Sequence, residues 1–121
     1  MKTYQQQGNT SLLTINHKTS AKVFVRNIVL IKGISNYSVI YIDGGRERVV
    51  SHTLKFYEDH LENHGFLRVH RGYMINPNFL KEYDTDEESI MMTNGVKVEV
   101  ARRKKFLLKN FKLTNNTVPK K

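Results

Sequence analysis

Residues 66–76 read Phe66-Leu67-Arg68-Val69-His70-Arg71-Gly72-Tyr73-Met74-Ile75-Asn76, and this stretch is the most informative part of the chain. Its polar and apolar residues do not alternate cleanly. Two basic residues at a strand end, followed by a glycine and an asparagine, suit a loop that approaches phosphates or base edges. The planar guanidinium of arginine can bond two acceptors on guanine, and the amide of asparagine can do the same with adenine. Taken alone, this is a weak signal, since surface arginines and turn asparagines are common.

The segments around this stretch predict a mainly β fold. Short runs rich in Val, Ile and Tyr alternate with turn residues. The expected strands are residues 12–15, 22–25, 28–34, 37–42, 46–52, 66–70, 73–76, 89–93 and 96–101. Glycines that accept a positive φ supply two hairpin turns, at residues 43–45 and at Asn94-Gly95. Pro77 limits any further strand to an edge or a loop. We expect about 45% strand and about 20% helix, a strand share well above average.

Two segments have a helical period instead. The first follows Thr53, the expected N-cap, and should end at Gly65 in a left-handed conformation. Its apolar face consists of Leu54, Tyr57 and Leu61. The second is the basic segment 102–111. Its apolar stripe would consist of Phe106, Leu107 and Phe111.

Length and composition indicate one globular domain. The chain has 121 residues, of which 39% are hydrophobic, so residues 12–113 can form one modest core. Residues 1–11 and the basic tail 114–121 are polar without an apolar period, and we expect both to be flexible. The absence of cysteine argues against a disulfide scaffold and a zinc ribbon. No signal peptide and no apolar run of about 20 residues are found, which predicts a cytoplasmic protein without a membrane span.

The charge is strongly positive and unevenly distributed. The net charge is +9, and residues 97–121 contain nine Lys or Arg and only one acid, Glu99. Residues 82–89 contain five carboxylates and no base. This polarity predicts one surface for a polyanion and an acidic surface that faces away from it. Charge alone equally fits a solubilising surface with a basic tail.

Together with its flanks, the 66–76 stretch resembles the signature of LytTR DNA-binding domains, commonly written F-x-R-x-H-R-S-x-x-V-N. The matching positions are Phe66, Arg68, His70, Arg71, Ile75 and Asn76. The resemblance extends from about residue 23 to residue 111. It includes the Asn36-Tyr37 pair between two strands, the short helix and the final hairpin. Several spaced elements in the right order make the match specific.

The chain departs from the family pattern at a few positions. Gly72 stands where Ser is usual, Ala101 stands where Ser usually precedes the arginine, and Lys32 occupies a position that is often acidic. Each could alter phosphate contacts or loop stiffness. Many members also carry an N-terminal receiver domain, and none is found upstream of Val23. We therefore expect control by protein abundance or by a separate regulatory protein, which could dock on the acidic face at residues 84–88.

The resemblance implies an elongated set of small antiparallel sheets with one or two short helices and no recognition helix. It implies a bacterial transcription regulator that binds double-stranded DNA by inserting loops into successive major grooves. We expect no enzymatic activity, no cofactor and no metal. The protein should be a monomer or a weak dimer in solution, with two copies binding at repeated sites.

Carried over by position, the resemblance implies three DNA-contacting loops. The expected contacts are Asn36, Tyr37 and Ser38 in the first, His70 and Arg71 in the second, and Arg102, Arg103, Lys104 and Lys105 in the third. Each has a structural alternative. Short polar loops between strands are turns by default, a strand histidine often bonds backbone, and Asn76 before a proline is a turn former. Adjacent lysines serve phosphates better than bases.

Three other functions compete with DNA binding. The basic surface could serve a protein-interaction module with an acidic partner, or an RNA-binding domain that stacks bases on exposed aromatics. Against RNA, the tyrosines are dispersed rather than clustered. A hydrolase or metalloenzyme ranks last, because no nucleophile motif or phosphate loop is found. His60 and His64 have metal-ligand spacing, but neither a cysteine nor the catalytic Glu of metalloproteases accompanies them.

Overall fold

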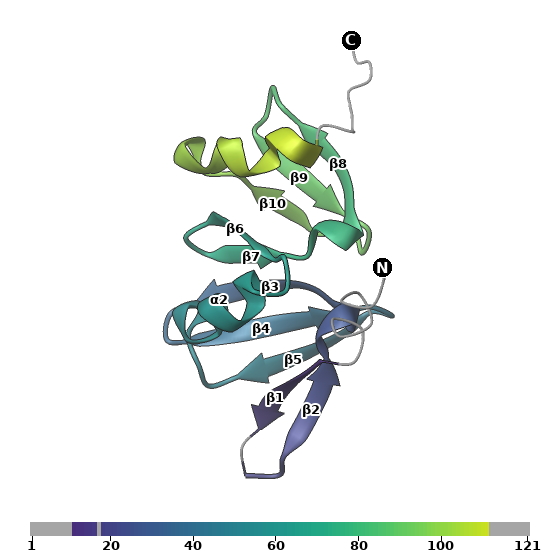
Figure 1. Cartoon of the computed structure of the whole chain (residues 1–121), viewed down its shortest axis with the longest axis vertical. Helices are drawn as coiled ribbons and strands as arrows, with labels where there is room; N and C mark the ends of the chain where they lie inside the picture. Colours follow the sequence, from purple (N-terminus) through teal and green to yellow (C-terminus); the bar gives the residue numbers. More distant parts are fainter. Residues whose placement is uncertain (1–10, 17, 112–121) are drawn as a thin grey trace.

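The computed structural model describes residues 11–16 and 18–111 (Figure 1). The strands are β1 (Leu12–Asn16), β2 (Ala21–Phe24), β3 (Ile28–Ile34), β4 (Tyr37–Ile42), β5 (Arg46–Val50), β6 (Leu67–His70), β7 (Tyr73–Ile75), β8 (Leu80–Asp84), β9 (Ser89–Met92) and β10 (Lys97–Glu99). The helices are α2 (Leu54–Glu62) and three of 3-10 type, η1 (Val25–Asn27), η2 (Pro77–Phe79) and η3 (Arg102–Phe111). Apart from Ser11, the end segments predicted to be flexible, 1–11 and 114–121, lie outside the described residues.

Three antiparallel sheets follow one another along the long axis of the molecule (Figure 1). The first is the β1–β2 hairpin. The second has five strands in the order β5-β4-β3-β7-β6, and the third has the order β10-β9-β8. The prediction of a mainly β fold built from small antiparallel sheets with short helices is confirmed.

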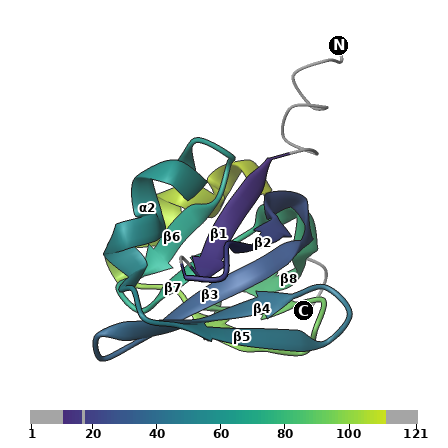
Figure 2. The ribbon, with the colours of Figure 1, turned by 90° about the horizontal axis from the view of Figure 1, so that it is seen from below.

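One face of the five-stranded sheet is covered by α2 and by the β1–β2 hairpin (Figure 2). The buried residues of this core are Leu13, Val25, Ile28, Ile31, Ile40, Ile42, Val50, Leu54, Tyr57, Leu61, Phe66 and Met74. The three residues of the predicted apolar helix face, Leu54, Tyr57 and Leu61, are therefore all buried against the sheet, as predicted. Burying each large aliphatic side chain contributes about 1.5–3 kcal/mol. The Tyr57 hydroxyl has no hydrogen-bond partner among the described residues, and its burial raises the pKa of Tyr57.

A second core joins the middle of the molecule to the third sheet and η3. Its buried residues are Val29, Leu30, Val69, Ile75, Ile90, Met92, Val98, Val100 and Leu108. A register shift between Ile28 and Leu30 lets the consecutive residues Val29 and Leu30 both join this core. The two cores thus share strands β3 and β7, and the chain forms a continuous packed unit from α2 to η3.

Helix α2 starts and ends close to the predicted positions. Gly65 has φ +88°, the left-handed conformation expected of a residue that ends a helix. Thr53 occupies the N-cap position, but its side chain makes no capping hydrogen bond, so the predicted chemistry of this cap is wrong. No helix of the described residues is both long and apolar enough to cross a membrane.

The second helix is present, but its predicted apolar stripe is wrong. In η3 the buried residue is Leu108, which is 1% exposed, whereas Phe106 is 59% exposed and Leu107 is half-buried. The third predicted member, Phe111, has a side chain outside the described set. A 3-10 helix aligns side chains three residues apart, so Leu108 shares a side with Lys105. The predicted stripe has the period of an α-helix, whereas this segment is a 3-10 helix that buries a different face.

Candidate nucleic-acid interface

The fold brings three segments that are distant in sequence to one edge of the molecule. The Gly33 amide donates a hydrogen bond to the Gly72 carbonyl at 2.8 Å, which joins the end of β3, just before the β3–β4 turn, to the β6–β7 turn. The Ala101 amide donates to the Val69 carbonyl at 2.8 Å, which joins the start of η3 to β6. In Figure 1 the three segments follow one another along the left side. We call residues 33–38, 70–72 and 101–105 the three-segment edge.

The β3–β4 turn exposes two of its three predicted contact residues. Ser35 adopts φ +53°, which closes the tight connection, and Asn36 and Tyr37 are exposed. Ser38 is fully buried, and its hydroxyl donates to the His52 carbonyl at 2.8 Å. In this structure the Ser38 side chain therefore holds the segment that leads into α2, and a contact between Ser38 and DNA stays a prediction.

In the β6–β7 turn, His70 has a structural role. Its Nδ1 accepts a hydrogen bond from the Gly72 amide at 3.0 Å, and its Nε2 lies 3.8 Å from a carboxylate oxygen of Glu99. The His70 side chain is 29% exposed, and its ring packs edge-on against Tyr73. A direct contact between His70 and DNA stays a prediction.

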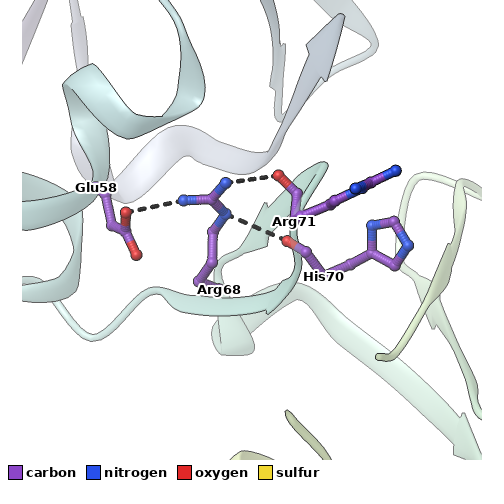
Figure 3. A network of polar contacts seen from close by, with 4 residues as sticks. All are labelled: Glu58, Arg68, His70 and Arg71. Carbon is purple, nitrogen blue, oxygen red and sulfur yellow. Dashed lines mark hydrogen bonds and ion pairs between the residues drawn. The ribbon is translucent and has the colours of Figure 1, made fainter. Parts of the chain in front are cut away.

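The Arg68 guanidinium lies between Glu58 and the backbone of the same turn (Figure 3). Its guanidinium pairs with Glu58 of α2 at 2.8 Å and donates to the carbonyls of His70 and Arg71. The Arg71 side chain extends away from this network and is exposed. No hydrogen bond or ion pair joins its guanidinium to another described residue. Sequence reasoning matched Arg68 to the signature but assigned it no role, and nothing in the sequence paired it with Glu58.

The third segment carries four consecutive cations at the start of η3. Arg102 and Arg103 are exposed, and Lys104 and Lys105 are half-buried. The Nζ of Lys105 lies 2.6 Å from a carboxylate oxygen of Glu88. This hydrogen bond, the Lys105 charge and the nearby Arg102 hold the pKa of Glu88 below its ordinary value. The lowered pKa keeps the Glu88 carboxylate ionised at neutral pH, and this carboxylate gains its proton only when the pH falls through that pKa.

The acidic stretch is not remote from the basic surface, so the predicted separation of charge is wrong. Glu88 pairs with Lys105, and Glu87 pairs with Lys97 at 2.9 Å. The hydrogen bond from Lys97 to Glu87 raises the pKa of this lysine. Glu88 has φ +55°, and its carbonyl accepts a hydrogen bond from the Val100 amide at 2.8 Å, which places its side chain beside η3.

Asn76, interpreted as a turn former, has that role. Its side-chain amide is buried, donates to the Ile28 carbonyl at 2.9 Å and accepts from the Asn78 amide at 3.1 Å. Because both ends of the amide are engaged inside the protein, Asn76 links η2 to β3. This residue of the signature is therefore structural.

The two histidines with metal-ligand spacing are engaged otherwise. The Nδ1 of His64 lies 3.0 Å from the His60 carbonyl, and its Nε2 lies 2.9 Å from the Ser11 hydroxyl. Burial and the proximity of His64 lower the pKa of His60. Within residues 11–16 and 18–111, no group of three or more metal-ligating side chains is found.

Comparisons with known proteins agree on one family. The sequence model described as LytTr DNA-binding domain matches residues 18–112, most of the chain. Among solved structures, the fold is similar to the LytTr DNA-binding domain of a Bacillus cereus protein described as a methyl-accepting/DNA response regulator. The TM-score is 0.68 at 20% identity, and the match covers 84% of this chain and 95% of that chain. No curated protein matches the sequence.

Proposed function

Because the chain belongs to the LytTr DNA-binding domain family, we propose that it regulates transcription by binding a preferred duplex sequence with the three-segment edge. The observation that carries this proposal is the gathering of Arg71, Arg102 and Arg103 on adjacent segments that backbone hydrogen bonds hold together. Exposed arginines, here one on a turn and two at the start of a helix, are suited to base edges and phosphates.

The segments divide the work of recognition. Arg71 reads base edges from the β6–β7 turn and Arg102 from the start of η3, each in one of two successive major grooves, where each base pair presents a distinct pattern of donors and acceptors. Arg103, Lys104 and Lys105 neutralise phosphates. Asn36 and Tyr37 contact the duplex from the β3–β4 turn, and His70 supports the middle loop and lies within reach of the backbone.

Two observations favour duplex DNA over the other functions considered. Among the residues whose side chains the structure describes, the large exposed aromatic ones are Phe24, Tyr37, Phe56 and Phe106, and they lie on four different elements. An RNA-binding sheet would instead present them together for base stacking. The family is one of DNA-binding domains and not of enzymes, which is consistent with the prediction that the chain is not an enzyme. A module for an acidic protein remains the second candidate, supported by the charge alone.

The direct test is a selection of duplexes from a random-sequence library. We expect one enriched motif that the protein prefers over a shuffled duplex of the same composition. The arrangement of the enriched sites also tests the stoichiometry, because repeated half-sites would support two copies on one operator and single sites a monomer. Equal affinity for the enriched and shuffled duplexes would favour the acidic-partner module.

The Glu88–Lys105 pair predicts a variant that binds DNA more tightly. The Glu88 carboxylate pairs with Lys105, which we propose binds a DNA phosphate. The phosphate must therefore displace this carboxylate when DNA binds. Glu88→Gln is therefore expected to raise the affinity for every duplex roughly two- to fivefold, the range of a partly exposed ion pair. Glu82→Gln is the matched control, since this exposed residue gives the same change of net charge. Lower affinity of Glu88→Gln would mean that Glu88 orients η3 for binding.

A further inference from the structure

We propose that Glu58 and Arg68 form a brace that sets the shape of the β6–β7 turn and thereby determines how well the protein discriminates between duplex sequences. Glu58 lies on α2, outside the three-segment edge. The proposal therefore gives a role in sequence discrimination to a residue that does not itself contact DNA. The inference rests on the proposed function and identifies positioning residues for it.

The brace consists of three contacts made by one guanidinium (Figure 3). The Nη1 of Arg68 bonds the Glu58 carboxylate at 2.8 Å, Nη2 donates to the Arg71 carbonyl at 2.5 Å, and Nε donates to the His70 carbonyl at 3.2 Å. The side chains of Arg68 and Glu58 are only 17% and 28% exposed. At such burial the pair is less screened by solvent than a surface ion pair.

These three contacts fix the backbone of the turn, and thereby the direction in which the Arg71 side chain extends. Two successive carbonyls, of His70 and Arg71, point at the same cation, and the Glu58 carboxylate sets the plane of that cation. The next peptide is held as well, because the Gly72 amide donates to His70 and the Gly72 carbonyl accepts from Gly33. A loop that is ordered before binding loses less conformational entropy when it binds. The resulting gain in affinity applies to base contacts, which need exact placement of the side chain, and therefore favours the preferred duplex over others.

Only arginine fits the position of Arg68. A planar fork can direct three N–H groups at three acceptors at once, whereas the lysine ammonium is a compact charge on a flexible stem. Arg68→Lys keeps the charge and can keep one contact, but it cannot hold both carbonyls and the carboxylate in one plane. The substitution thus separates the brace from a requirement for positive charge.

The experiment compares Glu58→Gln, Arg68→Lys, the double variant that combines them and the control Asp59→Asn in the full chain. Asp59 is the next residue on α2, is exposed, and gives the same change of net charge as Glu58→Gln. For each variant, the ratio of affinities for the selected duplex and for a shuffled duplex is measured at one salt concentration. Backbone order parameters of Arg71 and Gly72 are measured by NMR relaxation in the free protein, together with the melting temperature.

We expect Glu58→Gln and Arg68→Lys each to lower the affinity ratio roughly three- to tenfold, the cost of ordering a loop on binding. The order parameters of Arg71 and Gly72 should fall from about 0.85 toward 0.6, while Asp59→Asn changes neither quantity. The double variant should be no worse than Arg68→Lys alone, because both substitutions break the same network.

Two results would overturn the brace. A Glu58→Gln variant that binds every duplex more tightly would mean that Arg68 itself contacts a phosphate once its carboxylate partner is gone. A lower melting temperature with an unchanged affinity ratio and rigid Arg71 and Gly72 would mean that the pair only stabilises the fold. If the wild-type protein prefers no duplex, the proposed function fails, and the order parameters alone decide whether the brace holds the turn.

Discussion

Raising the monovalent salt concentration from 50 to 200 mM is expected to weaken DNA binding about a thousandfold. A protein that neutralises about six phosphates releases their counterions, and the logarithm of the binding constant then falls with the logarithm of the salt concentration with a slope near −5. Six cations lie on the three-segment edge or directly beside it: Lys32, Arg71, Arg102, Arg103, Lys104 and Lys105. The measurement is a titration of labelled selected and shuffled duplexes at four or more salt concentrations.

The two duplexes serve as controls for each other in this titration. Phosphate contacts carry no sequence information, so both duplexes should show steep slopes, with the selected duplex bound more tightly throughout. Heparin should compete with both. A nearly flat slope for both duplexes would contradict a phosphate-binding surface and leave the acidic-partner module as the better explanation of the charge.

The parts of the fold that could be predicted from sequence are those whose local pattern and tertiary position agree. Strands β3 and β4 lie at the predicted residues, because their runs of β-branched and aromatic residues are buried in the centre of a sheet. Strand β8 was missed. Its sequence, Leu80–Asp84, contains three charged residues, and as an edge strand it depends on pairing with β9 rather than on its own composition.

At the candidate site, the cations could be located from the sequence, but the residues that form ion pairs and hydrogen bonds with them could not. The hydroxyl of the buried Ser38 donates a hydrogen bond to the carbonyl of His52, which lies fourteen residues away in the sequence. The partner of Lys105 comes from the β8–β9 turn, and the partner of Arg68 from α2. Such pairs arise from packing between elements, for which a single sequence contains no periodic signal. Charge segregation along the chain was therefore a poor guide to charge segregation on the surface.

Replacing Arg71 or Arg102 by alanine is expected to weaken binding of the selected duplex by roughly 1–3 kcal/mol each, because each loses a bidentate contact to a base edge. Together the two substitutions should nearly abolish discrimination, since they remove base readout from two of the three segments. Both side chains are exposed, so the melting temperature should change little. The measurement is the affinity for the selected duplex and for variants with one base pair changed.

Two controls separate base readout from charge. Arg46→Ala removes the same charge from an exposed position at the start of β5. Arg46 lies at the end of the β4–β5 hairpin that is far from Tyr37, so this substitution should have little effect on DNA binding. Lys105→Ala should weaken binding to every duplex about equally, as expected for a phosphate contact. The arginine variants should instead relax the preference at particular base pairs. If both bind the selected duplex as tightly as the wild-type protein, another surface of this LytTr domain reads the sequence.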